Sequence, residues 1–519
     1  MKHAQNDSGT ANPCHKRYQT ACRLTCLLLA LVLLTACGRV QPAGIEATPA
    51  ETTAPVLTPP EQAVNLLFGI PFHESRRINP ITAASQTDRD VDALLFDPLF
   101  RVDAFYQAQP NLCTDAVYED GKLRLTIRED VLFTDGSMLG AEDVVYSLRM
   151  AMEDENSCYR SRFAGVTAIE ADGRRSVVLT LHAAHPSLTA MLDIPIIKHG
   201  TGQDNDAVGT GRYRMMESDG QRYLVTNTAH FSGQSGHAQM THMLLVDVSD
   251  ADALVYAAVS GNLGILRPDI AAGVELHADA DRYRIPTATL IYIGFRTASG
   301  LFASESVRRS AAAALADVDW NKTQTARAPD FYPEALGYAD SDKSDKEETA
   351  RSARWTVHGT VRLLVNADAA DELAAAEAAG DALATAGLTV EWLKESGSAY
   401  TAALQKGEYD LFVGAFDAGA DFDLRGLLAT GGSQNRTGCG SVELDALLTS
   451  YVRAGTADGE LIARQIVTAA KQEAAVVPVG YRCGTALLNR KFGIRNVKPT
   501  MGDVFDNIYD WVYDRTEMK

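Results

Sequence analysis

The sequence predicts a mixed α/β protein that folds as two or three domains. Three observations support this prediction. About 460 of the 519 residues follow the N-terminal segments described below, and one hydrophobic core rarely supports so long a chain. The first half of this body has the alternating pattern of short strands, and the second half alternates strands with helices.

The first 36 residues have the pattern of a cleaved export signal. A basic segment precedes the apolar run within residues 24–37, which is shorter than the about 20 residues that a membrane-spanning helix needs. The run ends in Leu-Thr-Ala-Cys at Cys37, which resembles the lipobox of bacterial lipoproteins, whose cysteine is lipidated and becomes the new N-terminus. We therefore expect residues 1–36 to be removed and Cys37 to anchor the protein outside a membrane. A signal or short anchor with an incidental cysteine is the alternative.

Residues 37–61 are expected to form a spacer. They are rich in Pro, Ala and Thr and show no hydrophobic periodicity, so they cannot bury enough surface to fold. No later apolar run reaches the about 18 residues of a membrane helix. The formal net charge of −19 argues against binding to nucleic acids or to an anionic lipid surface.

The first half of the body is predicted to be rich in strands. Residues Gly121–Arg128 and Ser176–His182 alternate apolar and polar side chains. Between them, Ala141–Met152 has helical periodicity, with acidic residues in its first turn. Residues 209–215 are typical of a turn that enters a strand, and Tyr223–Thr228 is its expected hairpin partner.

The second half is predicted to form a parallel sheet flanked by helices. The expected strand–helix–strand–helix–strand order is Thr360–Val365, Ala370–Ala386, Leu388–Leu393, Tyr400–Gln405 and Tyr409–Gly414. Ligands of such sheets bind outside the carboxyl ends of the strands. The glycine-bearing, acid-rich loop 415–423 follows the third strand and is therefore a candidate site, with an ordinary solvated loop as the alternative.

No set of catalytic residues is found. The chain lacks the nucleophile elbow, the phosphate-binding loop and the helical zinc motif. The pair His182 and His185 ends a strand, where side chains three apart point to opposite faces. A second group, made of His230, His237 and His242, has no acidic partner nearby. We therefore expect neither an enzyme nor a bound metal or cofactor.

Four cysteines remain in the body, namely Cys113, Cys158, Cys439 and Cys483. An even number outside the cytoplasm permits disulfides. The pairings Cys113–Cys158 and Cys439–Cys483 would each join neighbours in sequence, and reduced thiols are the alternative. No two of these cysteines form a Cys-x-x-Cys motif, which argues against a metal or redox site.

Residues 131–148 read Val-Leu-Phe-Thr-Asp-Gly-Ser-Met-Leu-Gly-Ala-Glu-Asp-Val-Val-Tyr-Ser-Leu. This segment resembles a signature of the extracytoplasmic solute-binding proteins of the peptide/nickel ABC-importer class, bacterial solute-binding protein family 5. Its Asp-Gly pair makes a turn, and the Ala-Glu-Asp that follows begins a helix with inward-facing valines. Further segments that resemble family motifs, in the family's order, are Ile78–Pro80, Leu94–Phe100, Gly209–Tyr213, Ser306–Asp317, Tyr409–Leu411 and Leu444–Leu448.

The resemblance implies an α/β, periplasmic-binding-protein-like fold of two lobes around a hinge, with a β-rich subdomain inserted in lobe one. On this chain, lobe one would comprise residues 62–88, 190–282 and 478–519. The inserted subdomain would comprise residues 89–189, and lobe two residues 283–477.

The resemblance also implies a function. A monomeric lipoprotein would capture a solute, in the first place a short peptide, between its lobes and deliver it to the permease subunits of an ABC importer. Import of a nickel chelate, an oligosaccharide or another small solute stays open. So does a sensory or adhesive lipoprotein on the same fold, which Gly264, in place of the family's usual acid, would permit.

For the binding site, the resemblance implies that a loop aspartate binds the ligand's amine. Asp421 is the expected residue, and Asp417 competes for the role because the spacing of the loop is altered. Four more residues are expected at this site: Gly414 with backbone hydrogen bonds, Phe416 as an apolar wall, and Ser85 with Gln86 facing them from lobe one.

Overall fold

The computed structural model describes residues 67–183, 185–267, 279–320, 325–327, 330–336, 338, 358–454 and 456–513. The predicted signal, the predicted lipidation site Cys37 and the predicted spacer 37–61 lie outside these residues. Within them, no helix combines the length and apolar character needed to cross a membrane.

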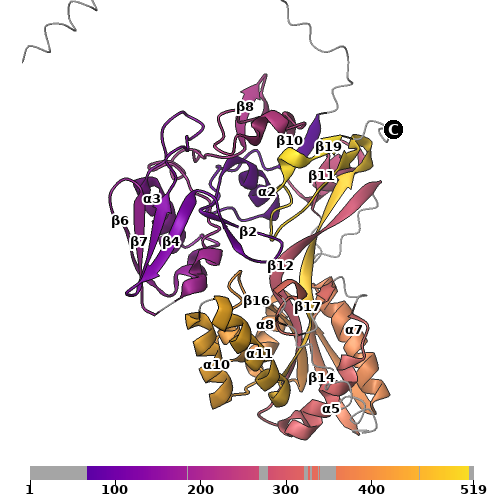
Figure 1. Ribbon diagram of the computed structural model, residues 1–519. Coiled ribbons are helices and arrows are strands. Elements are labelled where there is room, and N and C mark those ends of the chain that lie inside the picture. Colours follow the sequence, from indigo (N-terminus) through magenta and orange to yellow (C-terminus); the bar gives the residue numbers. More distant parts are fainter. Residues whose placement is uncertain are drawn as a thin grey trace, which may run out of the picture. The chain divides into compact units, whose positions relative to one another are not determined.

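Lobe one contains two four-stranded sheets (Figure 1). The strand order of the first is β1 (Phe68–Phe72), β10 (His242–Asp247), β9 (Gln221–Thr226) and β8 (Tyr213–Ser218). β1 and β10 are parallel, whereas the other neighbours are antiparallel. The prediction of a turn that enters a strand, followed by a hairpin partner, is confirmed by β8 and β9.

The second sheet of lobe one is antiparallel throughout. Its order is β4 (Cys113–Glu119), β5 (Lys122–Ile127), β7 (Ser176–Leu181) and β6 (Val166–Ala171). Helix α3 (Ala141–Glu153) begins where the Gly140 backbone N–H donates to the Asp143 carboxylate at 2.8 Å, and it buries Val144 and Leu148. Both predicted strands and the predicted helix are therefore confirmed. One hydrophobic cluster includes side chains from both sheets of lobe one.

Lobe two is built on a seven-stranded sheet. Its order is β11 (Ile265–Leu266), β17 (Val476–Asn489), β12 (Ala280–Phe295), β16 (Leu411–Asp417), β14 (Gly359–Asn366) and β15 (Leu388–Glu395), with β13 (Thr325–Arg327) beside β17. Strands β14, β15 and β16 are parallel, and helices α7 (Ala370–Thr385) and α8 (Gly397–Lys406) connect them. The predicted βαβαβ unit is therefore confirmed.

Helices cover both faces of this sheet, as Figure 1 shows. The odd-numbered residues of β14, such as Val361 and Leu363, share a core with α5 (Glu305–Ala316) and α7. Leu364 points to the opposite face and shares a second core with α8, α10 (Val442–Arg453) and α11 (Thr456–Glu473). This is the layering that a sheet with two apolar faces requires.

The remaining elements are short. They are α2 (Gln86–Leu95), α4 (Ala251–Val259), α9 (Arg425–Leu428), the hairpin of β2 (Phe100–Val102) and β3 (Ala108–Pro110), the pair β18 (Ile494–Arg495) and β19 (Val512–Tyr513), and the 3₁₀ turns η1 (Arg160–Phe163), η2 (Pro186–Met191), η3 (Gln234–His237), η5 (Leu301–Ala303), η7 (Glu334–Leu336), η8 (Arg490–Phe492) and η9 (Ile508–Asp510).

The long strands β12 and β17 run through both lobes. Ile285 and Leu488 belong to the core of lobe one, whereas Ile293 belongs to a core of lobe two. Between these ends the pairing of the two strands shifts register after Pro286. Such an irregularity bends a strand and interrupts its ladder. The sequence-based lobe boundaries at 282/283 and 477/478 fall inside these two strands.

The third strand of the βαβαβ unit is longer than predicted. We expected it to end at Gly414, but β16 continues to Asp417 because its residues 415–417 keep pairing with β12. Phe416 therefore lies within the sheet and is buried, and the loop begins at Ala418.

The predicted disulfides are absent. Cys113, Cys158 and Cys439 are free thiols, which excludes both pairings. The physical reason is that the cysteines of each pair contact different parts of the fold. The Cys113 thiol lies 3.0 Å from the Asp115 carbonyl oxygen, and the Cys158 thiol lies 3.8 Å from that of Ile81. The alternative of reduced thiols holds for these three residues.

Candidate ligand-binding site

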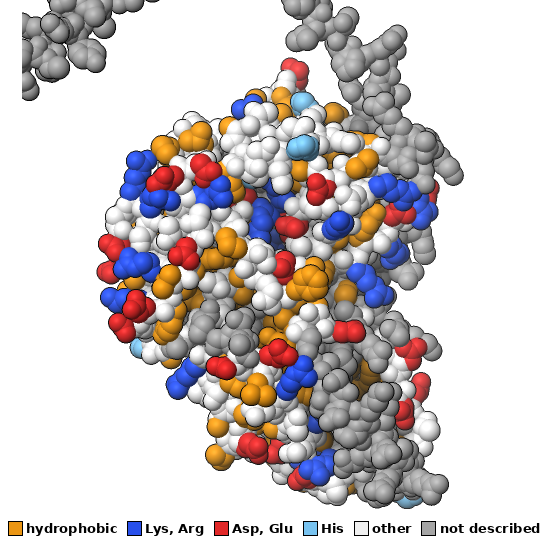
Figure 2. Space-filling view, viewed as in Figure 1, with side chains coloured by type: hydrophobic (Ala, Val, Ile, Leu, Met, Phe, Trp, Pro, Cys, Tyr) orange, Lys and Arg blue, Asp and Glu red, His pale blue; other side chains and the backbone are white. Residues whose placement is uncertain are grey.

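A cavity of about 850 Å³ lies between the two lobes. The loop after β16 forms the lobe-two wall, with residues of the segment 417–425. The opposite wall is formed by helix α2 and by residues of the segments 158–165 and 182–195. The lining of the cavity is completed by Thr287–Thr289 of β12 and by a C-terminal loop at 500–506. Figure 2 shows basic and acidic side chains in and around the hollow on this face. The volume lies within the about 300–1,000 Å³ typical of small-molecule sites.

Hydrogen bonds between neighbouring residues fix the conformation of the loop that carries Asp421. The Asp417 carboxylate accepts a hydrogen bond from the Gly419 N–H at 3.1 Å, and the Phe422 N–H donates to the Gly419 carbonyl at 3.3 Å. Gly419 has a φ of 65°, and a Cβ there would lie 3.0 Å from both Asp421 Oδ1 and Met191 Sδ. Glycine is therefore required where the loop turns its aspartate toward lobe one.

Asp421 makes a contact across the cavity. Its Oδ2 lies 2.9 Å from Nε2 of His185, which immediately precedes η2 on the lobe-one wall. The Asp421 side chain is only 5 % exposed. The two lobes thus meet through an aspartate and a histidine that are far apart in the sequence.

Four arginines line the cavity, namely Arg89, Arg101, Arg162 and Arg425. Arg162 forms an ion pair with Asp193 and lies over the ring of Tyr159. Arg425 forms an ion pair with Asp423 in its own loop, with Nη2 and Oδ2 2.6 Å apart. Arg162 and Arg425 are therefore neutralised by carboxylates of the protein itself.

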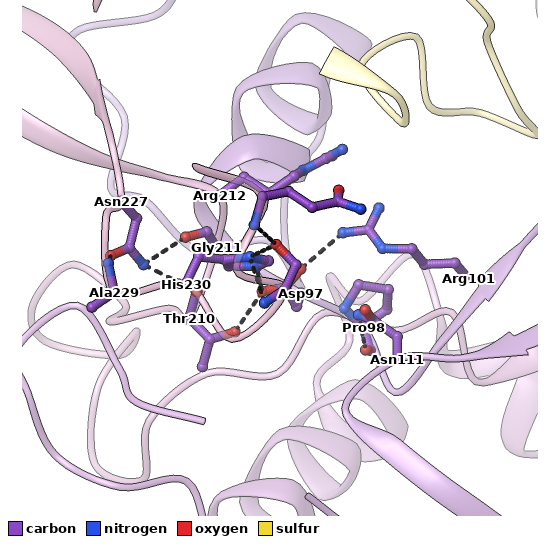
Figure 3. Close-up of polar contacts among 12 residues, drawn as sticks. Asp97, Pro98, Arg101, Asn111, Thr210, Gly211, Arg212, Asn227, Ala229 and His230 are labelled. Atoms are coloured by element: carbon purple, nitrogen blue, oxygen red, sulfur yellow. Dashed lines mark hydrogen bonds and ion pairs between the residues drawn. The ribbon is translucent and has the colours of Figure 1, made fainter. Parts of the chain in front are cut away.

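Arg101 is positioned by a buried network around Asp97 (Figure 3). Arg101 Nη2 lies 2.8 Å from Asp97 Oδ1, and the Thr210 hydroxyl donates to Oδ2 at 2.9 Å. The Nε2 of His230 lies 3.1 Å from the same Oδ2. Burial raises the pKa of the Asp97 carboxyl, but hydrogen bonding to His230 and attraction to His230, Arg101 and Arg212 outweigh burial and hold that pKa well below its usual range.

This network joins two motifs that lie far apart in the sequence. Gly211 donates from its backbone N–H to the Leu95 carbonyl at 3.0 Å, and Cβ atoms at Gly209 and Gly211 would collide with residues 95 and 96. The glycines of the 209–213 turn are therefore needed for close contact with the segment that carries Asp97. This explains why two of the segments that resemble family motifs occur together.

Arg212 links the same turn to the C-terminal loop. Its Nη1 donates to the carbonyls of Phe505 at 2.7 Å and Asp506 at 2.5 Å, and its Nη2 lies 3.2 Å from Asp503 Oδ2. The backbone carbonyl of Arg212 accepts from the Tyr509 hydroxyl at 3.0 Å. The side chain is nearly buried, so it fastens the C-terminal loop that completes the cavity wall.

The six sequence-predicted site residues separate into two groups. Asp421, Asp417 and Gln86 line the cavity. Ser85, Gly414 and Phe416 are not among the described residues that line it: Ser85 instead caps α2 through the Asp88 N–H at 3.1 Å, and Gly414 pairs with Tyr292 in the sheet. Gly414 and Phe416 are buried within β16, whereas Asp417, the last residue of the same strand, is exposed and lines the cavity.

The two histidine groups also separate. His182 and His185 line the cavity, whereas His230 belongs to the Asp97 network. In the part of the chain that the structure describes, no three His, Cys, Asp or Glu side chains are grouped so that they could hold a metal ion. Sequence reasoning missed Arg89, Arg101 and Arg162, because arginines in an acidic chain carry no motif that separates cavity residues from surface ones.

Comparison with known families identifies the chain. Residues 107–438 match the model described as bacterial extracellular solute-binding proteins, family 5, middle region. The chain belongs to this family. Family-5 solute-binding proteins are extracytoplasmic, non-enzymatic components of transport systems.

The individual relatives of the chain are distant in sequence. Protein XP55 of Streptomyces lividans is 25 % identical over 271 residues, and the match covers 49 % of each protein, so the chain spans about half the length of this curated relative. The oligopeptide-binding protein AppA of Bacillus subtilis, solved with a nonapeptide, has a TM-score of 0.58 at 15 % identity, with 86 % of this chain and 99 % of that one covered. A nickel ABC transporter structure from Bacillus halodurans has a TM-score of 0.67 at 17 % identity, with 84 % and 98 % covered. These structures establish the two-lobe fold of the family-5 proteins for this chain.

Proposed function

We propose that this protein is the substrate-binding component of an ABC importer and that it captures short peptides between its lobes. The observation that carries the proposal is the cavity between the lobes, with the nearly buried carboxylate of Asp421 on one wall. Peptide is the substrate class to be tested first, because one solved relative binds a nonapeptide and the Asp421 carboxylate could bind a peptide amino group. A second solved relative is a nickel transporter, so a nickel complex is the next class to be tested.

Asp421 would bind the amino group of the peptide. Its Oδ2 faces His185, whereas Oδ1 accepts only a long contact of 3.5 Å from the Asp423 N–H among the described residues. One carboxylate oxygen is therefore open to a cationic ligand. Breaking such a buried charge pair typically costs about 2–5 kcal/mol, which corresponds to a loss of affinity of roughly 30-fold to several thousand-fold.

Capture would proceed by closure of the lobes. A ligand that touches both walls binds the closed form better and shifts the population toward it. The loaded protein would then dock on membrane permease subunits, and a lipid on Cys37 would hold it at the membrane. None of these steps needs covalent chemistry.

Native mass spectrometry of the purified protein, before and after addition of a mixed pool of short peptides, tests the proposal. We expect peptide adducts that are strongly reduced in Asp421→Asn. The matched control is Asp381→Asn, an exposed aspartate of α7 on the same lobe that does not line the cavity. A chelate, a sugar or no adduct at all would refute peptide binding, and equal adducts in both variants would refute the role of Asp421.

A further inference from the structure

We propose that Arg89 is the anion anchor of this cavity and binds a carboxylate of the ligand, so that the ligand is dipolar, with its cationic end at the Asp417–Asp421 loop. This inference rests on the proposed function of the cavity and adds the chemical class of the ligand. The residue lies on α2, on the wall opposite that loop.

The hydrogen bonds of Arg89 leave its charge unmatched. Its Nη1 donates to the Ala83 carbonyl at 3.1 Å, and Nη2 and Nε donate to Gln86 Oε1 at 3.1 and 3.3 Å. A longer bond of 3.4 Å runs to the Ala84 carbonyl. All of these acceptors are neutral. They fix the orientation of the guanidinium, whose five N–H groups are not all used, without neutralising it.

The other cavity arginines are paired with acids. Arg101 contacts Asp97, Arg162 contacts Asp193, and Arg425 contacts Asp423. Among the residues that the structure describes, Arg89 has no carboxylate oxygen within 4.0 Å. The nearby acid Asp92, which also lines the cavity, attracts the charge of Arg89 but forms its ion pair with Arg76 Nη2, at 2.6 Å. Arg89 is therefore the cavity cation that is left for a ligand.

Two acids on the opposite wall are similarly placed for a ligand. Asp417 is exposed, and its carboxylate accepts a hydrogen bond from the nearby Gly419 N–H. Asp421 has one oxygen directed to His185 and one open. A cavity with an unmatched cation on lobe one and available carboxylates on lobe two is complementary to a dipolar molecule. A ligand of this kind would also favour closure, because its two ends contact different lobes.

A planar guanidinium recognises a carboxylate through two parallel hydrogen bonds. In a short peptide that carboxylate is either the C-terminus or an acidic side chain. Both carboxylates present the same chemistry to Arg89. Amidated peptides without acidic residues contain neither carboxylate, so they show which of the two Arg89 binds when they are compared with peptides that keep one of them.

The test compares two peptide pools that lack Asp and Glu, one with free and one with amidated C-termini, by native mass spectrometry and calorimetry on the purified protein. We expect the wild type to bind the free acids about 30-fold or more tightly than the amides. In Arg89→Gln that preference should disappear. Arg214→Gln, at an exposed arginine of β8 on the same lobe, should keep it.

Other results would overturn the assignment to the C-terminus. Equal binding of acids and amides by the wild type would exclude the C-terminus. If amides that carry one Asp or Glu then bind more tightly than amides without one, and Arg89→Gln abolishes this gain, Arg89 binds a side-chain carboxylate instead. A preference for acids that persists in Arg89→Gln would refute the role of Arg89. If Arg89→Gln fails to fold, Arg89→Lys replaces it: the lysine keeps the charge but not the planar pair of donors, so its preference for acids should be weaker than that of the wild type, and an unchanged preference would refute two-bond recognition by Arg89.

Failure of the proposed function has a distinct signature, namely that neither pool binds to any variant. Arg89 is then tested with N-acetylalanine, a carboxylate without an amine. A rise in melting temperature in the wild type that is lost in Arg89→Gln would support the anion site. Identical melting temperatures with and without this probe would refute it.

Discussion

His185 and Asp421 are joined across the cavity, with Nε2 and Oδ2 2.9 Å apart. The aspartate belongs to the loop after β16 of lobe two, and the histidine precedes η2 in lobe one. The pair therefore joins the two lobes at the very carboxylate proposed to bind the ligand. An amine that binds the Asp421 carboxylate must share this carboxylate with His185 or displace the histidine from it.

Replacing His185 by Ala should raise the affinity for an amine-bearing peptide severalfold, because the internal partner of Asp421 is removed. The same change should lower the free energy of unfolding by about 1.5–3 kcal/mol, as expected for a lost hydrogen bond to a charged group. Calorimetry with the peptide pool and denaturant unfolding measure the two effects. Lower affinity would instead make His185 part of the binding surface.

Gly419→Ala should weaken binding without unfolding the protein. The new Cβ would lie 3.0 Å from Asp421 Oδ1 and Met191 Sδ, so the carboxylate must move. Gly431→Ala is the matched control, because Gly431 also has a positive φ, of 68°, but open space around its Cβ position. Both variants should lose about 1 kcal/mol of stability through backbone strain. Only Gly419→Ala should lose affinity, and equal affinities would show that the position of Asp421 is unimportant.

Much of the fold could be predicted from local patterns. The βαβαβ unit has alternating periodicities and a glycine after α7, so its order and parallel arrangement follow from the sequence. The end of β16 could not be predicted, because pairing of residues 415–417 with β12 depends on a strand more than a hundred residues away. Because we predicted the end of this strand too early, we assigned Gly414 and Phe416 to the binding loop, whereas both residues lie within the sheet.

The candidate site was predicted mainly on the lobe-two side, and of the two residues expected from lobe one only Gln86 lines the cavity. Asp417 ends a parallel strand and Asp421 follows it, and that position is informative in itself. The opposite wall is assembled from α2 and from segments around residues 160 and 190, which carry no common pattern. Likewise, contact between Asp97 and the 209–213 turn becomes visible only when both are placed in space.

Arg212→Met should destabilise the protein by about 3–5 kcal/mol, because the change leaves two backbone carbonyls of the C-terminal loop without their buried cation and removes the shorter of the two arginine contacts of Asp503. Urea unfolding measures this effect. Arg214→Met, two residues along and exposed, should change stability by less than about 0.5 kcal/mol. Similar losses in both variants would mean that the Arg212 contacts contribute nothing specific.

Asp92 should make stability fall as the pH rises through mildly acidic values. Burial raises the pKa of its carboxyl from 3.8 to about 6, although hydrogen bonds and the charge of Arg76 oppose the rise. Between these two values the unfolded chain releases a proton that the folded protein keeps, so the folded state loses relative stability with increasing pH. The shift corresponds to about 2–3 kcal/mol at about 1.4 kcal/mol per unit.

The measurement for Asp92 is the free energy of unfolding of the wild type and Asp92→Asn between about pH 4 and pH 6, the range set by the ordinary and the raised pKa. The difference between the two proteins should change across this range in the direction that disfavours the wild type at higher pH. A difference that stays constant would show that Asp92 does not titrate there.

Tyr106 gives the sharpest test of lobe closure. It lies in the β2–β3 turn attached to lobe one, yet it packs in a core of lobe two, edge to face on Phe422 with 5.0 Å between the ring centres. Both residues have left-handed backbone angles, φ 58° for Tyr106 and 52° for Phe422, which bulky side chains adopt only when their surroundings hold them. The contact therefore ties a turn of lobe one to the residue after Asp421.

Tyr106→Ala should shift the free protein toward open lobes, because the closed form loses an aromatic pair worth about 0.5–1.5 kcal/mol beyond its buried area. Ligand binding must then supply closure, so affinity should fall by roughly tenfold. Small-angle scattering of the free protein and calorimetry with the peptide pool measure the two effects. Phe105→Ala, the neighbouring residue with 64 % of its surface exposed, should leave both unchanged. If Tyr106→Ala behaves like this control, the contact with Phe422 does not govern closure.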